Sequence, residues 1–121
     1  MTDTKNASFG PETAPARYGL LTTNQTGTII AVNERLANWL GLDAFQMTGA
    51  PFVEMLTKAS RIVFETSIVP LLSLNGHVDG VSLDLKDAEA NKLPVLLSAE
   101  ETGSGERTVT SFVFLLADAR R

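Results

Sequence analysis

The sequence predicts one α+β domain, a five-stranded antiparallel sheet with short helices packed on one face, and three observations lead to this fold class. Two β-branched apolar segments flank a tight turn near the start of the chain, and a helical middle follows. Three more segments then have the composition or alternation of strands. The 121 residues include no cysteine, so the core has to form without disulfides, which a chain of this length can do.

The first two strands are expected over residues 18–23 and 28–32 and should form a hairpin. The tetrapeptide Asn24-Gln25-Thr26-Gly27 lies between them and has turn chemistry. Gly27 can take the positive φ that closes a tight connection, because it has no Cβ.

A capped helix follows the hairpin. The side-chain oxygen of Asn33 can accept a free amide hydrogen of a helix that begins at Glu34, and Gly41 is suited to the position after its last turn. The apolar residues of this helix recur at helical spacing: Leu36, Trp39 and Leu40.

The middle of the chain predicts three further helical segments. Asp43 can cap a short turn over residues 44–47, and Pro51 suits the start of the next segment, whose apolar positions include Phe52 and Leu56. Residues 57–74 have the longest helical pattern. Pro70 interrupts it, because proline lacks a backbone donor and clashes with the carbonyl four residues earlier, so the helix kinks or a second turn starts there.

Three strands are expected over residues 81–86, 93–101 and 107–118, with a hairpin loop over 102–106. The last strand is apolar on both faces, so both faces should be covered. Its inward row is expected to be Phe112, Phe114 and Leu116. Its outward row is expected to be Val113, Leu115 and Ala117.

From about Tyr18 onward the chain resembles the PAS domains, a family of bacterial sensory modules. The features that carry the resemblance follow in the family's order: Gly27 in the first turn, Asn33 opening the first helix, Leu40-Gly41 closing it, Gly49, a polar turn over residues 87–92, and Asp118. The family often has Asp-x-Thr at the end, whereas this chain has Asp118-Ala119-Arg120. The expected organisation is a flexible extension over residues 1–17 and a PAS domain over 18–121.

The composition of the chain restricts the classes of partner that we expect. A formal net charge of −4 argues against a nucleic-acid surface, which normally shows clustered Lys and Arg. The sequence has neither an apolar run long enough to cross a bilayer nor the apolar core of a signal peptide at its start. We therefore expect no nucleic-acid partner, no membrane segment in this chain and a cytoplasmic location.

No catalytic constellation stands out, so we expect the chain itself not to be an enzyme. His77 is the only histidine and lies in an expected connection, where a solvated loop residue is the simplest interpretation. The acidic pairs Glu100-Glu101 and Asp87-Glu89 fall at a strand end and in a turn, where they are expected to be solvated.

The resemblance implies a core cavity between the sheet and the helices, where the family holds cofactors or small ligands. Cysteine-linked flavin is disfavoured because there is no cysteine, and haem because the long helix has no histidine, although His77 just beyond it could serve as a displaced ligand. We expect no cofactor. The inward residues fit either a filled core or a pocket for a small apolar ligand oriented by Thr23. These candidates are Leu21, Thr23, Trp39, Phe52, Leu56, Phe64, Ile68, Leu83, Leu85, Val95, Leu97, Ala99, Phe112, Phe114 and Leu116.

Two functions follow from the resemblance. The first is a sensor that regulates a fused effector, such as a histidine kinase, a diguanylate cyclase or a serine phosphatase, through a shift of the last strand. The second is a dimerisation module without a ligand, in which the outward row Val113, Leu115 and Ala117 forms the interface of a homodimer.

Overall fold

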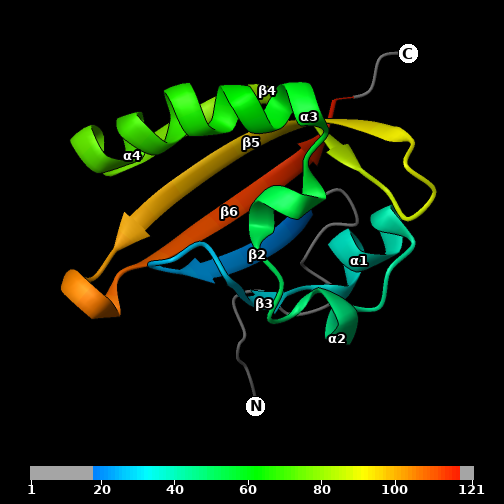
Figure 1. The fold of residues 1–121 in the computed structure, drawn as a ribbon, viewed down its shortest axis with the longest axis horizontal. Helices are drawn as coiled ribbons and strands as arrows, with labels where there is room; N and C mark the ends of the chain where they lie inside the picture. The colour runs from blue at the N-terminus through cyan, green and yellow to red at the C-terminus, as the bar shows by residue number, and fades with distance from the viewer. Residues whose placement is uncertain (1–17, 118–121) are drawn as a thin grey trace.

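The computed structural model describes residues 18–117, which form an antiparallel sheet with helices on one face (Figure 1). The strand order is β3-β2-β6-β5-β4, so the last strand lies in the middle of the sheet beside the first, and the predicted five-stranded α+β fold is confirmed. Residues 1–17 and Asp118, to which the sequence assigns an extension and a strand end, lie outside the described residues. The strands are β2 Tyr18–Asn24, β3 Ile29–Val32, β4 His77–Lys86, β5 Lys92–Thr102 and β6 Val109–Leu116.

Short helical segments connect β3 to β4 and cover the inner face of the sheet (Figure 1). They are α1 Glu34–Leu40, α2 Ala44–Met47, the 3-10 turn η2 Phe52–Met55, α3 Lys58–Val63, the π-helical segment η3 Phe64–Ile68 and α4 Val69–Asn75. The helical pattern over residues 57–74, in which the sequence predicts an interruption at Pro70, forms three parts: α3, η3 and α4. Pro70 lies in the first turn of α4, so the helical path is interrupted next to that proline.

Two strands begin two or more residues away from where the sequence predicts. β4 starts at His77 instead of residue 81, because a bulge at Gly80, with φ of 62°, carries the strand through a segment that looks like a turn. The Gly80 N–H donates to the Ser98 hydroxyl at 3.0 Å and fixes this bulge. β6 starts at Val109 instead of residue 107, because the 3-10 turn η4 Gly105–Arg107 precedes it.

Asn33 joins α1 to the sheet. Its side-chain oxygen accepts hydrogen bonds from the backbone N–H of Leu36 and of Leu20, both at 3.0 Å. Its side-chain nitrogen donates to the carbonyl of Tyr18 at 3.2 Å. The predicted cap is thus confirmed, and the same residue also fixes α1 against the start of β2.

Gly19 allows α1 to approach the sheet closely. A Cβ at this position would lie 3.0 Å from a ring carbon of Trp39 and 3.1 Å from Leu36, which is tighter than ordinary packing. At its other end α1 stops at Gly41, whose φ of 69° places it in the left-handed conformation that favours glycine.

The α3–η3–α4 path is anchored to the edge strand β4 at its start, in α3. Thr57 caps α3 by accepting from the Ser60 N–H, and the buried Ser60 hydroxyl accepts from the Asp84 N–H at 2.8 Å. The Thr57 N–H in turn donates to the Asp84 carbonyl at 3.2 Å. These bonds fix the start of the α3–η3–α4 path over the sheet, and the far end of that path borders the site described next.

Candidate functional site

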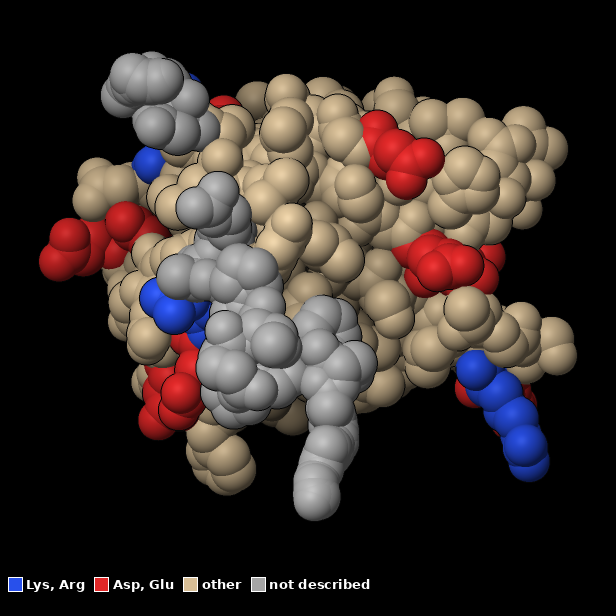
Figure 2. Space-filling model, turned by 180° about the vertical axis from the view of Figure 1, so that it is seen from behind, with Lys and Arg blue, Asp and Glu red and all other residues tan. Residues whose placement is uncertain are grey.

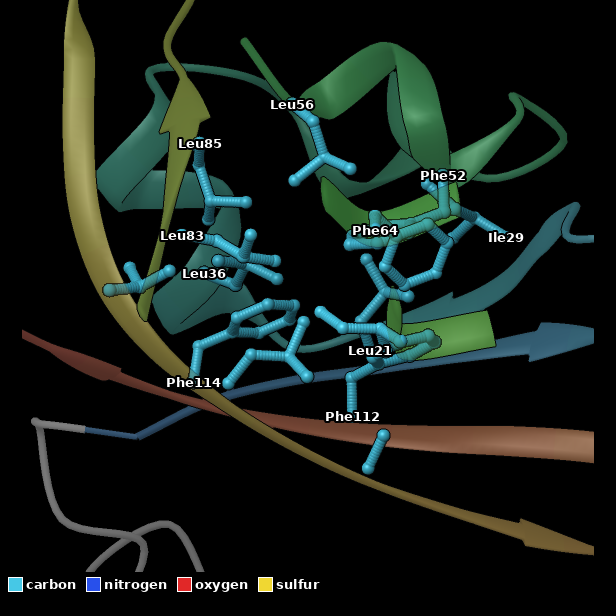
Figure 3. Packing of buried hydrophobic residues seen from close by; sticks show 14 of the residues in the cluster. Leu21, Ile29, Leu36, Phe52, Leu56, Phe64, Leu83, Leu85, Phe112 and Phe114 are labelled. Atoms are coloured by element: carbon cyan, nitrogen blue, oxygen red, sulfur yellow. The ribbon is translucent and has the colours of Figure 1, made fainter. Parts of the chain in front are cut away.

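Most of the inward residues predicted from the sequence lie in one buried cluster (Figure 3). Whether any of them contacts a ligand stays a prediction. The members of the predicted set that are buried in this cluster are Leu21, Phe52, Leu56, Phe64, Ile68, Leu83, Leu85, Val95, Leu97, Ala99, Phe112 and Phe114.

Two predicted inward residues lie elsewhere. Trp39 is half-buried and packs at the margin of the cluster, over Gly19. Leu116 is 40% exposed, so its prediction as a cavity residue is wrong. It is the last residue of β6, and since β2 begins at Tyr18 opposite Leu115, Leu116 has a strand neighbour on one side only within the described sheet.

Phenyl rings occupy the centre of the domain. The ring centroid of Phe52 lies 4.7 Å from that of Phe112, 5.3 Å from Phe64 and 6.0 Å from Phe114. Phe52 and Phe114 are each exposed by 2% or less. These contacts are those of a close-packed interior, which favours the filled-core interpretation for the centre of the domain.

A cleft of about 260 Å³ opens beside this filled centre. It lies between the β2–β3 turn, the helical path η3–α4 and the ends of β5 and β6. Its apolar walls are Val53, Phe64, Val69, Leu72 and Phe112. The structure therefore has a cleft at one end of the sheet, beside the packed centre.

Three polar side chains form a row across the inner face of the sheet at this cleft. Thr23 of β2 pairs directly with Thr110 of β6, and Thr110 pairs with Glu101 of β5. The two threonines are only 3% and 8% exposed, and all three residues line the cleft. No hydrogen bond among residues 18–117 involves either threonine hydroxyl, so both are free to contact a molecule in the cleft.

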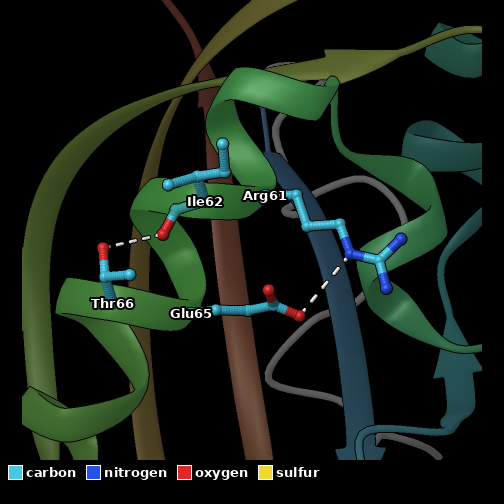
Figure 4. A network of polar contacts seen from close by, with 4 residues as sticks. All are labelled: Arg61, Ile62, Glu65 and Thr66. Atoms are coloured by element: carbon cyan, nitrogen blue, oxygen red, sulfur yellow. Dashed lines mark hydrogen bonds and ion pairs between the residues drawn. The ribbon is translucent and has the colours of Figure 1, made fainter.

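The π-helical segment η3 shapes the opposite wall. The Val69 N–H donates to the carbonyl of Phe64, five residues earlier, and Pro70 cannot donate at all. The Thr66 hydroxyl donates to the Ile62 carbonyl at 2.7 Å (Figure 4). This local geometry places Phe64 and Val69 at the cleft, and π segments of this kind are frequent at functional sites.

Glu65 lies on the same wall and is the second carboxylate of the cleft. Its partner is Arg61 one turn earlier, with Nε and Oε2 3.5 Å apart (Figure 4). Both side chains are about half exposed, at 49% and 52%, so the pair contributes little to stability. The lining of the cleft includes two carboxylates and no Lys or Arg among residues 18–117.

A second hollow, of about 350 Å³, lies on the opposite face of the sheet and is lined by His77, Asp79, Glu100 and Ser111. His77 Nδ1 is 3.4 Å from Asp79 Oδ2, and the two side chains are 60% and 80% exposed. His77 is thus solvated as expected, but on a strand. His77 lies on the outer face of the sheet, so it does not face the core, where a haem ligand would have to lie.

The described residues offer no arrangement for a metal ion: residues 18–117 contain no group of three His, Cys, Asp or Glu suited to bind one. None of the helices in that range is long and apolar enough to span a membrane. On the face shown in Figure 2, Lys and Arg are scattered and do not form a patch.

Sequence reasoning identified Thr23 but missed Thr110, Glu101 and Glu65. Thr110 could have been found, because it alternates in phase with the inward residues Phe112 and Phe114. Glu65 depends on the π segment, for which the sequence pattern contains no comparable signal.

Comparison with known proteins identifies one curated relative and many similar structures. The chain is 31% identical over 84 residues to the phosphoserine phosphatase RsbP of Bacillus subtilis strain 168. The match covers 69% of this chain but 21% of RsbP, so the chain spans about a fifth of that protein's length. No protein-family model matches the chain.

The similar solved structures are PAS domains of low sequence identity. One, from a protein of Colwellia psychrerythraea, has a TM-score of 0.74 and 13% identity, over 86% of this chain and 88% of that one. Another belongs to a LuxR-family transcriptional regulator of Burkholderia thailandensis in complex with ethanol, with a TM-score of 0.70 and 16% identity over 84% and 90%. A third, from a two-component sensor histidine kinase, has a TM-score of 0.69 and 8% identity over 82% and 84%.

Proposed function

The chain has the fold of a PAS domain, and on this premise we propose that it is a sensory module that binds a small molecule and regulates an effector. The observation that carries the proposal is the cleft of about 260 Å³ with two buried threonine hydroxyls that have no hydrogen-bond partner among residues 18–117. Ligand sites are typically concave and mostly apolar, with a few polar groups that fix orientation, and this cleft has those features.

Strand β6 is the element through which we expect binding to be transmitted. Thr110 and Phe112 of this strand line the cleft, and the strand ends at Leu116, roughly 20 Å further along. β6 also lies between β2 and β5 in the middle of the sheet. A ligand that prefers one position of β6 would therefore shift the population of conformations at the end of that strand.

The sequence leaves a histidine kinase, a diguanylate cyclase and a serine phosphatase as candidate effectors, and we propose the phosphatase. The support is the 31% identity with RsbP, whereas the similarity to the histidine-kinase PAS domain is 8% and indicates the fold alone. The domain itself is proposed to act without a cofactor and without catalysis. The proposed location is the cytoplasm, and recovery of the protein in another fraction after cell fractionation would contradict it.

A chimera tests the sensory function. This chain would replace the segment of RsbP that it matches, and the phosphoserine phosphatase activity of the chimera would be measured. Val69→Trp fills the mouth of the cleft from a side chain that is 43% exposed, and it should change the activity by about fivefold or more. The matched control is Ile62→Trp, which is 59% exposed and outside the cleft, and it should leave the activity unchanged. An activity that is equal in both variants and the parent chimera would contradict the proposal.

The second candidate function is a dimerisation module, and the outer face of the sheet favours it. Val113 is 37% exposed there, and Leu115 on the same strand is half-buried between Tyr18 and Leu96, its partners on the neighbouring strands. Ala117, the third predicted interface residue, follows the end of β6, and its N–H donates to the Pro94 carbonyl at 3.0 Å. Apolar rows of this kind are typical of interfaces.

Sedimentation of Leu115→Glu tests the homodimer. The wild-type chain is expected to sediment as a dimer and the variant as a monomer, because a buried carboxylate without a partner is costly at an apolar interface. Ser82→Glu, an equal charge at an exposed edge position of the same face, is the control and should stay dimeric. A monomeric wild-type chain would remove this second function.

A further inference from the structure

We infer that the cleft selects a compact apolar molecule with a primary ammonium group. This inference rests on the proposed function, since it concerns the ligand of the same cleft. Three observations lead to it: the polar row Thr23, Thr110 and Glu101, the absence of Lys and Arg from the cleft lining within residues 18–117, and the size of the cleft.

The polar row supplies the acceptors that an ammonium group needs. An ammonium group has three N–H donors and no acceptor. Thr110 is the middle residue of the row, and its Cβ lies about 5 Å from that of each directly paired neighbour. A group above Thr110 is therefore close to the Thr23 hydroxyl on one side, and the longer side chain of Glu101 can bring its carboxylate to the group from the other side. Three donors then meet three acceptors, and the two buried hydroxyls, which have no partner among residues 18–117, become hydrogen-bonded.

Charge excludes the opposite ligand class. Glu101 and Glu65 both line the cleft. Arg61 pairs with Glu65 but is not itself part of the cleft lining. A carboxylate or phosphate ligand would therefore face two carboxylates, with no Lys or Arg among the described lining residues to bind it. A neutral alcohol would not be repelled, but its single O–H donor can satisfy only one acceptor. Without a positive charge, it also gains no electrostatic attraction to the carboxylates.

Size restricts the apolar part of the ligand. The cleft volume of about 260 Å³ lies just below the range of about 300–1,000 Å³ that is typical of small-molecule sites, so a compact ligand is expected. A six-membered carbon ring with one amino group fits this volume, and its ring would pack against Phe64, Phe112 and Leu72. Cyclohexylammonium is therefore a suitable probe, and cyclohexanol and cyclohexanecarboxylate differ from it only in the polar group.

The test is a calorimetric or NMR titration of the 121-residue chain with these three probes at pH 7. We expect cyclohexylammonium to bind about tenfold more tightly than cyclohexanol, and cyclohexanecarboxylate to show no binding. Glu101→Gln should weaken the ammonium probe about tenfold while leaving cyclohexanol within about twofold. The matched control is Glu100→Gln, which removes an adjacent carboxylate from the outer face and should change neither affinity.

A second variant separates binding from folding. Thr110→Val keeps the shape of a buried side chain and removes its hydroxyl, so it should weaken cyclohexylammonium without loss of the folded spectrum. Equal or tighter binding of cyclohexanol, or unchanged ammonium binding in Glu101→Gln, would overturn the ammonium inference and leave the sensory function standing. Binding of none of the probes, together with no effect of Val69→Trp in the chimera, would overturn both.

Discussion

Replacement of Phe52 by alanine is expected to lower the free energy of unfolding by about 3 to 5 kcal/mol. Phe52 is 2% exposed, and its ring contacts the rings of Phe64, Phe112 and Phe114. Removing it takes away the apolar transfer free energy of one phenyl ring and also leaves a void that rigid aromatic neighbours fill poorly. Urea denaturation followed by circular dichroism measures the change.

Phe45→Ala is the matched control for this prediction. Phe45 lies on α2 with 87% of its surface exposed, so the same chemical change should alter the free energy of unfolding by less than about 0.5 kcal/mol. Equal effects of the two substitutions would contradict a filled aromatic centre. The account would then lose its reason for placing the ligand site at the end of the sheet.

Asn33→Ala is expected to cost about 2 to 3 kcal/mol, an unusually large effect for a half-buried polar residue. The substitution removes the cap on Leu36, typically worth about 1 kcal/mol, together with the bonds to Leu20 and Tyr18, each worth about 1 kcal/mol. The loss detaches α1 from β2, where Gly19 allows close packing. The same denaturation experiment measures it.

Two variants separate the parts of this effect. Asn33→Asp keeps the oxygen that accepts from Leu36 and Leu20, but it replaces the donor to Tyr18 by an oxygen that faces the Tyr18 carbonyl. Its cost should therefore be smaller than that of Asn33→Ala without disappearing. Asn38→Ala changes an exposed asparagine of the same helix and should be neutral or slightly stabilising. If Asn33→Ala is no more destabilising than Asn38→Ala, the proposed link between helix and sheet is wrong.

Local chemistry made much of the fold predictable. The turn at Gly27, the cap at Asn33, the stop at Gly41 and the Asp43 cap each depend on residues adjacent in sequence, and the structure has all four. The alternation of Leu83 and Leu85 likewise placed the correct face of β4 inward. Such features need no knowledge of distant contacts.

Features set by the register of distant segments were less predictable. Leu116 has the correct phase for the inner face, but burial at a strand end depends on which neighbours extend beside it. Because of the bulge at Gly80, β4 starts earlier than the sequence predicts. The π segment forms one wall of the candidate site, whose lining includes Thr110 and Glu65, two residues that sequence reasoning missed. In the bulge and in the π segment, one extra residue in a regular strand or helix changes which side chains face the core. The hydrophobic pattern of the sequence is compatible with the segment with or without that extra residue.

The central claim is that this domain with the PAS fold binds a small molecule in the cleft beside η3, and the most direct test is amide chemical-shift mapping of the chain. Cyclohexylammonium and cyclohexanol would be titrated into ¹⁵N-labelled protein. The account predicts that the largest shifts fall on residues around Thr23, Glu65, Thr110 and Phe112, with smaller ones along β6 toward Leu116. Shifts confined to the outer hollow around His77, or no shift with either probe, would contradict it.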